Sequence, residues 1–236
     1  MNAMILAAGR GERMRPLTDV DPKPLLKVGE HPLIVWHILR LRAAGIDNIV
    51  INHAWLGHKI EAYLGNGSAL GVNIAYSPEP TGGLETGGGI ATALPLLGEQ
   101  AFMVVNGDVL MDVDFAALAA QSCDGVSRLA HILLVDNPEH HPEGDFGLLA
   151  DGLVAPSIDQ GTPLTFSGAG VYHPVLLQGL APLVRAKLPP YLRAAMAQGK
   201  VSGAHHQGTW FDVGTPERLQ QAQALVAGAA WTQCAS

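Results

Sequence analysis

The chain alternates short apolar runs with longer stretches in which apolar and polar positions are mixed. Five apolar runs of strand length predict strands buried on both faces, and they lie at Ala3–Ala8, Asn48–Asn52, Val72–Tyr76, Ala101–Asn106 and Leu129–Val135. Helices are predicted between them, at Pro32–Ala44, Gly57–Leu64 and Gly87–Leu97. Each predicted helix is followed directly by a glycine, the residue that most easily adopts the left-handed conformation just past a helix end.

This alternation predicts an α/β fold, a Rossmann-like three-layer sandwich with a mostly parallel central sheet. Ligands of such folds bind at the carboxyl ends of the strands. The pattern weakens from residue 138 to about Gly170, where glycines and prolines predict a small insertion of antiparallel pairs. A terminal helix is predicted with Thr215 as N-cap and Pro216 at its first position, and one of its faces holds Leu219, Ala222, Leu225 and Val226. We expect a single domain over residues 1–227 and a flexible tail over residues 228–236.

Composition narrows the classes of function. The chain has 236 residues, 48% of them hydrophobic, and a formal net charge of −7. Binding along a nucleic-acid backbone needs an excess of Lys and Arg, so the acidic balance argues against a nucleic-acid partner. No apolar run reaches the ~18 residues of a membrane-spanning helix, and the N-terminus lacks the pattern of a signal peptide. We expect a cytoplasmic protein without a membrane partner, either monomeric or weakly self-associating.

The loop after the first predicted strand has the composition of a phosphate-binding loop. Gly9 and Gly11 allow a sharp turn that exposes backbone N–H groups, and Arg13 and Lys23 add positive charge. The dinucleotide-binding fingerprint requires a third glycine where this chain has Met14, and the Gly-Lys-Ser/Thr of a P-loop is absent from the sequence. The loop therefore indicates a phosphate site of another kind.

Carboxylates supply the second chemical signal. Asp108 follows the predicted strand Ala101–Asn106, and Asp212 precedes the terminal helix. Carboxylate oxygens are the protein ligands that Mg²⁺ prefers, so the two aspartates are candidate metal ligands. The adjacent histidine pairs at 140–141 and 205–206 do not predict a zinc site, because neighbouring side chains point in different directions on a strand and diverge on a helix.

The opening segment resembles the sugar-1-phosphate nucleotidyltransferases. That family has a G-x-G-x-R-(L/M)-x-P-L-T signature followed by P-K-P, and the matching residues here are Gly9, Gly11, Arg13, Met14, Pro16, Leu17, Thr18, Pro22, Lys23 and Pro24. The resemblance covers nearly the whole chain to about Val226. It implies the nucleotide-diphospho-sugar transferase fold, Mg²⁺ as cofactor, and a nucleoside triphosphate and a sugar-1-phosphate as substrates.

The resemblance also assigns roles to residues. Catalytic roles fall to Arg13, Lys23, Asp108 and Asp212, and the two aspartates hold the metal. Nucleotide binding is expected at Leu6, Ala7, Ala8, Gly9, Gly11, Glu79, Glu85, Thr86 and Gly87. Sugar binding is expected at Asn106, Asp145, Gly147, Asp159 and Ser167. Two positions depart from the family pattern: Glu79 stands where many members have a glutamine, and Asp159 replaces a family E-K-P or E-E-P segment.

Four further segments narrow the substrates. The sequences at Ile51–Leu56, Leu84–Gly89, Asn106–Val109 and Val135–Pro138 resemble the branch that joins UTP to N-acetylmuramate α-1-phosphate in peptidoglycan recycling. Two alternatives stay open at this stage. One is another nucleotidyltransferase, a mannose- or heptose-1-phosphate guanylyltransferase or a glucose-1-phosphate uridylyl- or thymidylyltransferase. The other is a catalytically silent module that binds nucleotide sugars.

Overall fold

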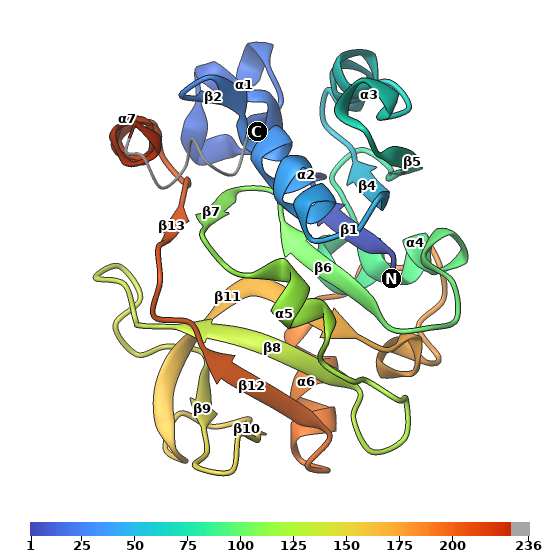
Figure 1. The fold of residues 1–236 in the computed structure, drawn as a ribbon, viewed down its shortest axis with the longest axis vertical. Coiled ribbons are helices and arrows are strands. Elements are labelled where there is room, and N and C mark those ends of the chain that lie inside the picture. The colour runs from blue at the N-terminus through green and yellow to red at the C-terminus, as the bar shows by residue number, and fades with distance from the viewer. Residues whose placement is uncertain (228–236) are drawn as a thin grey trace.

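The central sheet is built from parallel strands near the N-terminus and extended by strands from the second half of the chain. The computed structural model describes residues 1–227, so the predicted tail at 228–236 lies outside the described residues. Four parallel strands lie in the order β6-β1-β4-β5 (Figure 1), and their bounds are Phe102–Asn106, Ala3–Leu6, Asn48–His53 and Asn73–Pro78. These strands confirm the predicted parallel core.

Helices cover both faces of this sheet, which completes the predicted three layers. One face packs against α2 (Leu33–Ala43), α3 (Gly57–Leu64) and α5 (Phe115–Ala119), and the other against α4 (Glu85–Leu97) and α6 (Pro189–Met196). Successive side chains of β1 point to opposite faces of the sheet. Ile5 packs in the apolar cluster with the first group of helices, and Met4 packs in the cluster with the second. A strand buried on both faces has no polar alternation, which is why its sequence is continuously apolar.

The second half of the sheet differs from the sequence-based expectation. The insertion was expected to reach about Gly170 as a separate unit, but β11 (Thr162–Tyr172) is one long strand that belongs to both the insertion and the central sheet. Its first half pairs with β9 (Phe146–Leu148), which continues to β10 (Val154–Ala155) and forms the predicted antiparallel insertion. After a register shift between Phe166 and Gly170, its second half enters the central sheet between β6 and β8 (Ala130–Val135), antiparallel to both.

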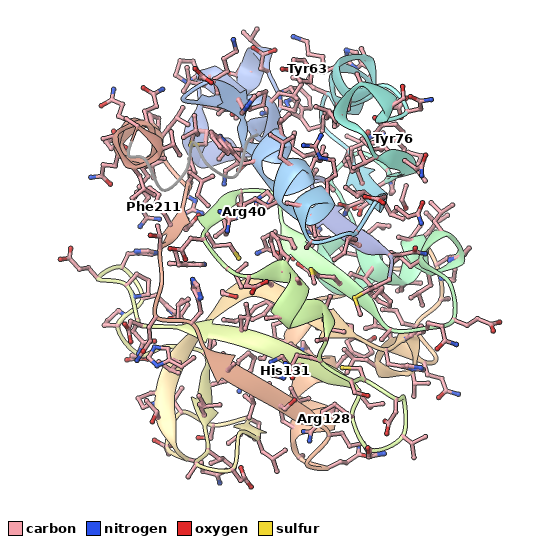
Figure 2. All side chains as sticks on the ribbon, in the orientation of Figure 1. Arg40, Tyr63, Tyr76, Arg128, His131 and Phe211 are labelled. Carbon is pink, nitrogen blue, oxygen red and sulfur yellow. The ribbon has the colours of Figure 1, made fainter. Side chains whose placement is uncertain are left out.

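The outer strand of this half was not predicted. β12 (Val201–His205) pairs in parallel with β8, although its sequence contains a single large apolar residue, Val201. Figure 2 labels His131 on β8, whose Nδ1 lies 2.8 Å from the Ser202 hydroxyl on β12. Polar contacts of this kind leave no hydrophobic pattern in the sequence, so the strand could not be recognised from periodicity.

The remaining elements bring the C-terminus back to the opening loop. Short elements follow the loop at α1 (Leu17–Val20), β2 (Lys27–Val28) and β3 (His31–Pro32). β7 (Val109–Met111) and β13 (Trp210–Asp212) form an antiparallel pair, and α7 (Pro216–Val226) follows. The Thr215 hydroxyl caps α7 by accepting from the Arg218 N–H, which confirms the predicted start. Leu219, Ala222 and Val226 of α7 pack with Met14 of the opening loop in one apolar cluster.

Gly88 in α4 has no room for a side chain, because another segment of the chain crosses the helix at this residue. The segment 184–187 runs over the first turns of α4, where Gly88 donates its N–H to the Ala186 carbonyl (2.9 Å) and Ala186 donates to the Leu84 carbonyl (3.0 Å). A Cβ added at Gly88 would lie 2.3 Å from the Val184 carbonyl oxygen. No side chain fits there unless the crossing segment moves.

We therefore expect Gly88→Ala to destabilise the fold, although alanine favours a helix by ~1 kcal/mol over glycine. Overpacking of this kind costs about 1–3 kcal/mol, and for a chain of this size each kcal/mol lowers the melting temperature by about 2–4 °C. Thermal unfolding measures the effect. The matched control is Gly9→Ala, because a Cβ at Gly9 would meet nothing within 4 Å. Equal melting temperatures for wild type and Gly88→Ala would contradict the packing argument.

Candidate active site

Two adjoining cavities lie at the carboxyl ends of β1, β4 and β6. The larger encloses about 710 Å³ and the smaller about 380 Å³. Asn106 and Asp108, at and just after the end of β6, line both.

No helix within residues 1–227 combines the length and apolar character needed to cross a bilayer.

The structure distributes the sequence-predicted residues between the two cavities. The larger is lined by Lys23 and by most of the residues expected to bind nucleotide, namely Leu6, Ala7, Ala8, Gly9, Glu79, Glu85 and Thr86. The smaller is lined by Arg13, Asp145, Ser167 and Asp212. Four expected residues line neither cavity: Gly11, Gly87, Gly147 and Asp159. Gly147 is buried where a Cβ would collide with the Gln160 carbonyl, and Asp159 is exposed and hydrogen-bonded to Ser157.

The opening loop is held by a contact that sequence reasoning missed. The Arg10 guanidinium lies over the Trp55 ring, 3.8 Å from its centroid, and donates to the Thr18 carbonyl (2.8 Å). Trp55 Nε1 donates to the same carbonyl (2.9 Å). Gly11 adopts a φ of 67° and its carbonyl accepts from the Thr18 hydroxyl (2.8 Å). Gly11 thus shapes the loop from behind, while Arg10 and Trp55 line the larger cavity.

Lys23 and Asp108 form an ion pair beside the larger cavity. Lys23 Nζ lies 2.7 Å from Asp108 Oδ2. The lysine side chain is only 9% exposed, whereas the aspartate side chain is 40% exposed. A buried lysine needs a partner to keep its charge, and Asp108 provides it while its other face stays accessible. The sequence placed both residues at the site but could not show that they touch.

The β7–β13 ladder brings Asp212 next to Asp108. In its register Asp212 lies opposite Val109, and the Val213 N–H donates to the Asp108 carbonyl (2.9 Å). Arg218, in the first turn of α7, donates from Nη1 to Asp212 Oδ2 (2.9 Å). The two candidate metal ligands therefore face the same small cavity, each paired with a basic residue. Arg218 was not predicted, because its role depends on the packing of α7.

A carboxylate bridge organises the larger cavity. Asn52, at the end of β4, accepts from the Ala7 N–H at Oδ1 (2.9 Å) and donates from Nδ2 to Glu79 Oε1 (2.6 Å). The other oxygen, Glu79 Oε2, accepts from the Leu84 N–H (2.6 Å). This chain of hydrogen bonds joins the ends of β1 and β4 to the start of α4. Sequence reasoning missed Asn52, whose only signal was a polar residue at the end of a buried strand.

The first residue of α4 is strained. Glu85 has a φ of 61°, a conformation that is unfavourable for a residue other than glycine. Its carboxylate pairs with Arg185 (2.9 Å), and both residues line the larger cavity. The helix begins at Glu85 rather than at the predicted Gly87, which packs against the backbone of Ala186 and Lys187.

A buried histidine lies behind the aspartate pair. His37 of α2 is 2% exposed and hydrogen-bonds the Val109 backbone. Burial lowers the pKa of His37 from 6.5 to about 4, and the nearby charge of Arg40 acts in the same direction, whereas Asp108 and the hydrogen bond oppose it. The imidazole is therefore neutral at neutral pH and supports the backbone next to Asp108.

The chain is similar to known proteins over nearly its full length. A family model described as nucleotidyl transferase matches residues 2–159. An N-acetylmuramate α-1-phosphate uridylyltransferase of Neisseria meningitidis is 62% identical over 227 residues, which cover 95% of this chain and 98% of that protein. A protein of the same name from Caulobacter vibrioides is 36% identical over 96% of this chain and 97% of its own. A crystal structure described as a glucose-1-phosphate thymidylyltransferase from Bacillus anthracis in complex with a sucrose superposes with a TM-score of 0.83 at 21% identity, covering 98% and 99% of the two chains; at that identity it supports the fold alone.

His37 generates a pH prediction. Because its pKa is lower in the folded chain than in the unfolded chain, unfolding takes up a proton between pH 6.5 and 4. The stability linked to His37 is complete above about pH 6.5 and falls as the pH drops toward 4, by on the order of 2 kcal/mol at pH 5. We expect the free energy of unfolding, measured with urea, to fall less between pH 7 and pH 5 in His37→Asn than in wild type. Identical pH slopes for the two chains would contradict the prediction.

Proposed function

The chain belongs to the nucleotidyl transferase family, and on this premise we propose that it joins UTP to N-acetylmuramate α-1-phosphate. The products are UDP-N-acetylmuramate and pyrophosphate. The observation that carries the proposal is the 62% identity to the Neisseria uridylyltransferase over nearly the full length of both chains. We place the reaction in the cytoplasm, in the recycling of peptidoglycan, and assign it to a single nucleotidyltransferase domain over residues 1–227 that acts as a monomer or weak homo-oligomer.

The two cavities suit the two substrates of such a transfer. We assign UTP to the larger cavity, where the opening loop and the start of α4 face each other, and the sugar phosphate to the smaller cavity. An oxygen of the sugar phosphate attacks the α-phosphorus of UTP in line, and the bond to the pyrophosphate oxygen breaks. The transfer needs no protein nucleophile. Asp108, shared by both cavities, stands where the reacting groups meet.

Positioning and charge are then the main contributions of the chain. We assign Arg13, which lines the smaller cavity together with Asp108, to the triphosphate where the two cavities meet, and Lys23 to the α-phosphoryl group and the incoming sugar phosphate. Fixed positive charges at these places stabilise the negative charge that develops on the phosphoryl oxygens and the leaving group. Lys23 is suited to this role because burial and its contact with Asp108 hold its ammonium group in place.

The carboxylates fit Mg²⁺. Within residues 1–227 no group of three or more His, Cys, Asp or Glu side chains is arranged to hold a metal ion, which disfavours a site made wholly of protein ligands. Mg²⁺ is typically held by one or two carboxylates together with substrate phosphates and water, and Asp108 and Asp212 supply that number. When bound, the ion neutralises phosphate charge and orients the phosphates for transfer. Lys23 and Arg218 each occupy one carboxylate oxygen, and the other oxygens stay available.

A substrate panel tests the proposed function. We expect Mg²⁺-dependent release of pyrophosphate from UTP with N-acetylmuramate α-1-phosphate to be faster than with the 1-phosphates of N-acetylglucosamine or glucose. GTP with mannose-1-phosphate is the comparison for a guanylyltransferase. Activity with that pair alone would keep the chemistry and overturn the substrates, and no activity with any pair would favour a silent nucleotide-sugar-binding module.

The role of Lys23 gives a second prediction. Lys23→Ala is expected to lower kcat about 10²–10³-fold, the usual effect of removing one group that stabilises transition-state charge, with a small change in melting temperature. The matched control is Lys59→Ala, which removes a lysine paired with Asp21 on the surface and should leave kcat within about twofold of wild type. A loss of activity accompanied by a fall of many degrees in melting temperature would show that Lys23 is structural.

A further inference from the structure

The smaller cavity is bordered by a loop with two adjacent histidines whose side chains contact different aspartates. The loop joins β8 to β9 and spans residues 138–144. His140 Nε2 lies 3.9 Å from Asp212 Oδ2, whereas His141 Nε2 lies 3.2 Å from Asp145 Oδ1. Both histidines line the cavity, and each side chain is 42% exposed. The two neighbouring histidines therefore contact different aspartates of one cavity.

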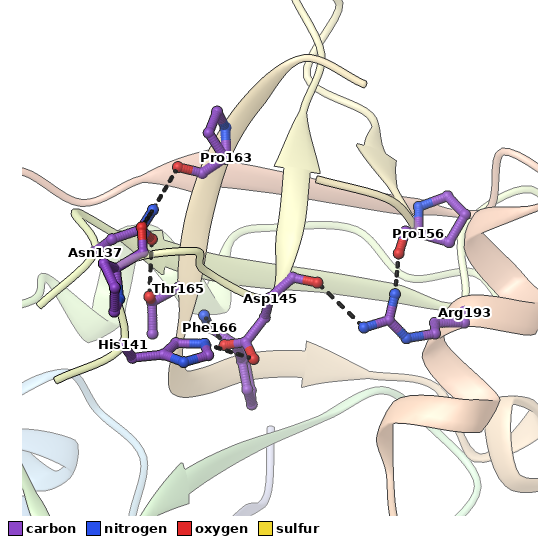
Figure 3. A network of polar contacts seen from close by, with 9 residues as sticks. Asn137, His141, Asp145, Pro156, Pro163, Thr165, Phe166 and Arg193 are labelled. Atoms are coloured by element: carbon purple, nitrogen blue, oxygen red, sulfur yellow. Dashed lines mark hydrogen bonds and ion pairs between the residues drawn. The ribbon is translucent and has the colours of Figure 1, made fainter. Parts of the chain in front are cut away.

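The loop is anchored to β11 at both of its ends (Figure 3). Before the loop, Asn137 donates from Nδ2 to the carbonyls of Pro142 and Pro163, both at 3.1 Å, and its Oδ1 accepts from the Thr165 hydroxyl (2.9 Å). After the loop, Asp145 Oδ2 accepts from the Phe166 N–H (2.9 Å). These bonds hold His141 against the cavity wall, so it can act as a fixed recognition group.

Asp145 is itself supported from behind. The guanidinium of Arg193, on α6, donates to the Asp145 carbonyl (3.2 Å) and to the Pro156 carbonyl (Figure 3). With Phe166 on one carboxylate oxygen and His141 on the other, both oxygens of Asp145 already have partners within the chain. A substrate group that lies beside Asp145 therefore meets the His141 ring as well.

The pairing fixes the hydrogen at His141. A carboxylate only accepts hydrogen bonds, so His141 Nε2 donates to Asp145 Oδ1 and carries a hydrogen. The remaining nitrogen, Nδ1, is a donor when the ring is protonated. A ligand carboxylate is an acceptor for such a donor. His141 can thus bridge Asp145 and an anionic group of a ligand.

The charged residues that line the smaller cavity also fall into a group near Asp212 and a group near Asp145. Asp108, Asp145 and Asp212 line it, and its basic lining residues within residues 1–227 are Arg13, His140 and His141. Arg13 and His140 lie near Asp212: His140 Nε2 is 3.9 Å from Asp212 Oδ2, and a Cβ added at Gly214 would lie 3.3 Å from both Arg13 Nη2 and the Asp212 oxygens. The charged and titratable groups near His141 are Glu139, His140 and Glu143 on its own loop, Asp145 just after the loop, and Arg193 behind Asp145. His141 is therefore the basic lining residue that contacts Asp145 rather than Asp212.

We propose that His141 binds the lactyl carboxylate of the sugar and so selects N-acetylmuramate over N-acetylglucosamine. This inference rests on the proposed function, in which the 1-phosphate lies toward Asp108 and Asp212. The sugar substrate has two anionic groups, the 1-phosphate and the lactyl carboxylate on the ring. Arg13 and His140 near Asp212 are available to the first anion, and His141, whose ring Asp145 holds, is available to the second.

The test compares two products that differ in the lactyl group. Dissociation constants of UDP-N-acetylmuramate and UDP-N-acetylglucosamine are measured by calorimetry for wild type and His141→Gln, whose amide still donates to Asp145 but has no charge. We expect His141→Gln to weaken binding of the muramate about tenfold and to change binding of the glucosamine by less than about twofold. The expected tenfold change corresponds to the low end of the free-energy range for a hydrogen bond to a charged group, because the His141 side chain is partly exposed.

Two further variants sharpen the test. His141→Lys keeps a positive charge and is expected to restore most of the preference for the muramate. His140→Gln, one residue away, is expected to leave the ratio of the two dissociation constants unchanged. Equal weakening of both products by His141→Gln would mean that His141 acts only by holding Asp145, and no weakening of either product would assign the carboxylate to another residue. Either result overturns this inference while the proposed function stands, whereas a wild type without preference for the muramate overturns both.

Discussion

Each aspartate that lines the smaller cavity is paired with a basic side chain from a different part of the chain. Asp108 pairs with Lys23 of the opening segment, Asp212 with Arg218 of α7, and Asp145 with His141 of the loop before β9. The chain has a net charge of −7, and substrates with several phosphate groups add more negative charge at this place. Close carboxylates without partners would repel one another and the substrates. The site therefore depends on basic residues that the fold delivers separately.

Apolar packing positions these basic residues beside the aspartates. Arg218 reaches Asp212 because α7 packs its Leu219 and Val226 against Met14 and neighbouring residues. The same cluster holds Val213, which is hydrogen-bonded to the Asp108 carbonyl. Burial of these side chains thus positions the opening loop, both candidate metal ligands and the last helix at once. The C-terminal helix belongs to the construction of the site although it lines neither cavity.

The sequence predicts the parts of this arrangement that depend on local patterns. Continuous apolar runs located the parallel strands, and glycines after helices located the helix ends. Asp108 and Lys23 stand in local motifs, so they could be recognised before their contact was known. β11 could not, because Ser167, Gly168 and Gly170 interrupt its apolar run where it passes from the insertion into the sheet. Partners such as Asn52, Arg218 and Arg10 were missed because only the tertiary fold brings them to the site.

The two hydrogen-bond partners of residue 79 explain why it is a glutamate here, where many family members have a glutamine. Asn52 cannot turn its amide around, because its Oδ1 accepts from the Ala7 N–H, and its Nδ2 therefore donates toward residue 79. The Leu84 N–H donates from the other side. Two donors require two acceptors, which a carboxylate offers and an amide does not. A glutamine would place its own N–H against one of these donors, and an unmatched polar contact in a partly buried position costs about 1–3 kcal/mol. Glu79 is thus the residue that this bridge requires, and both of its oxygens are occupied by the chain itself. The backbone around Leu6–Gly9 and Gly82–Leu84, which also lines the larger cavity, is then the surface that we propose for recognition of the nucleotide base.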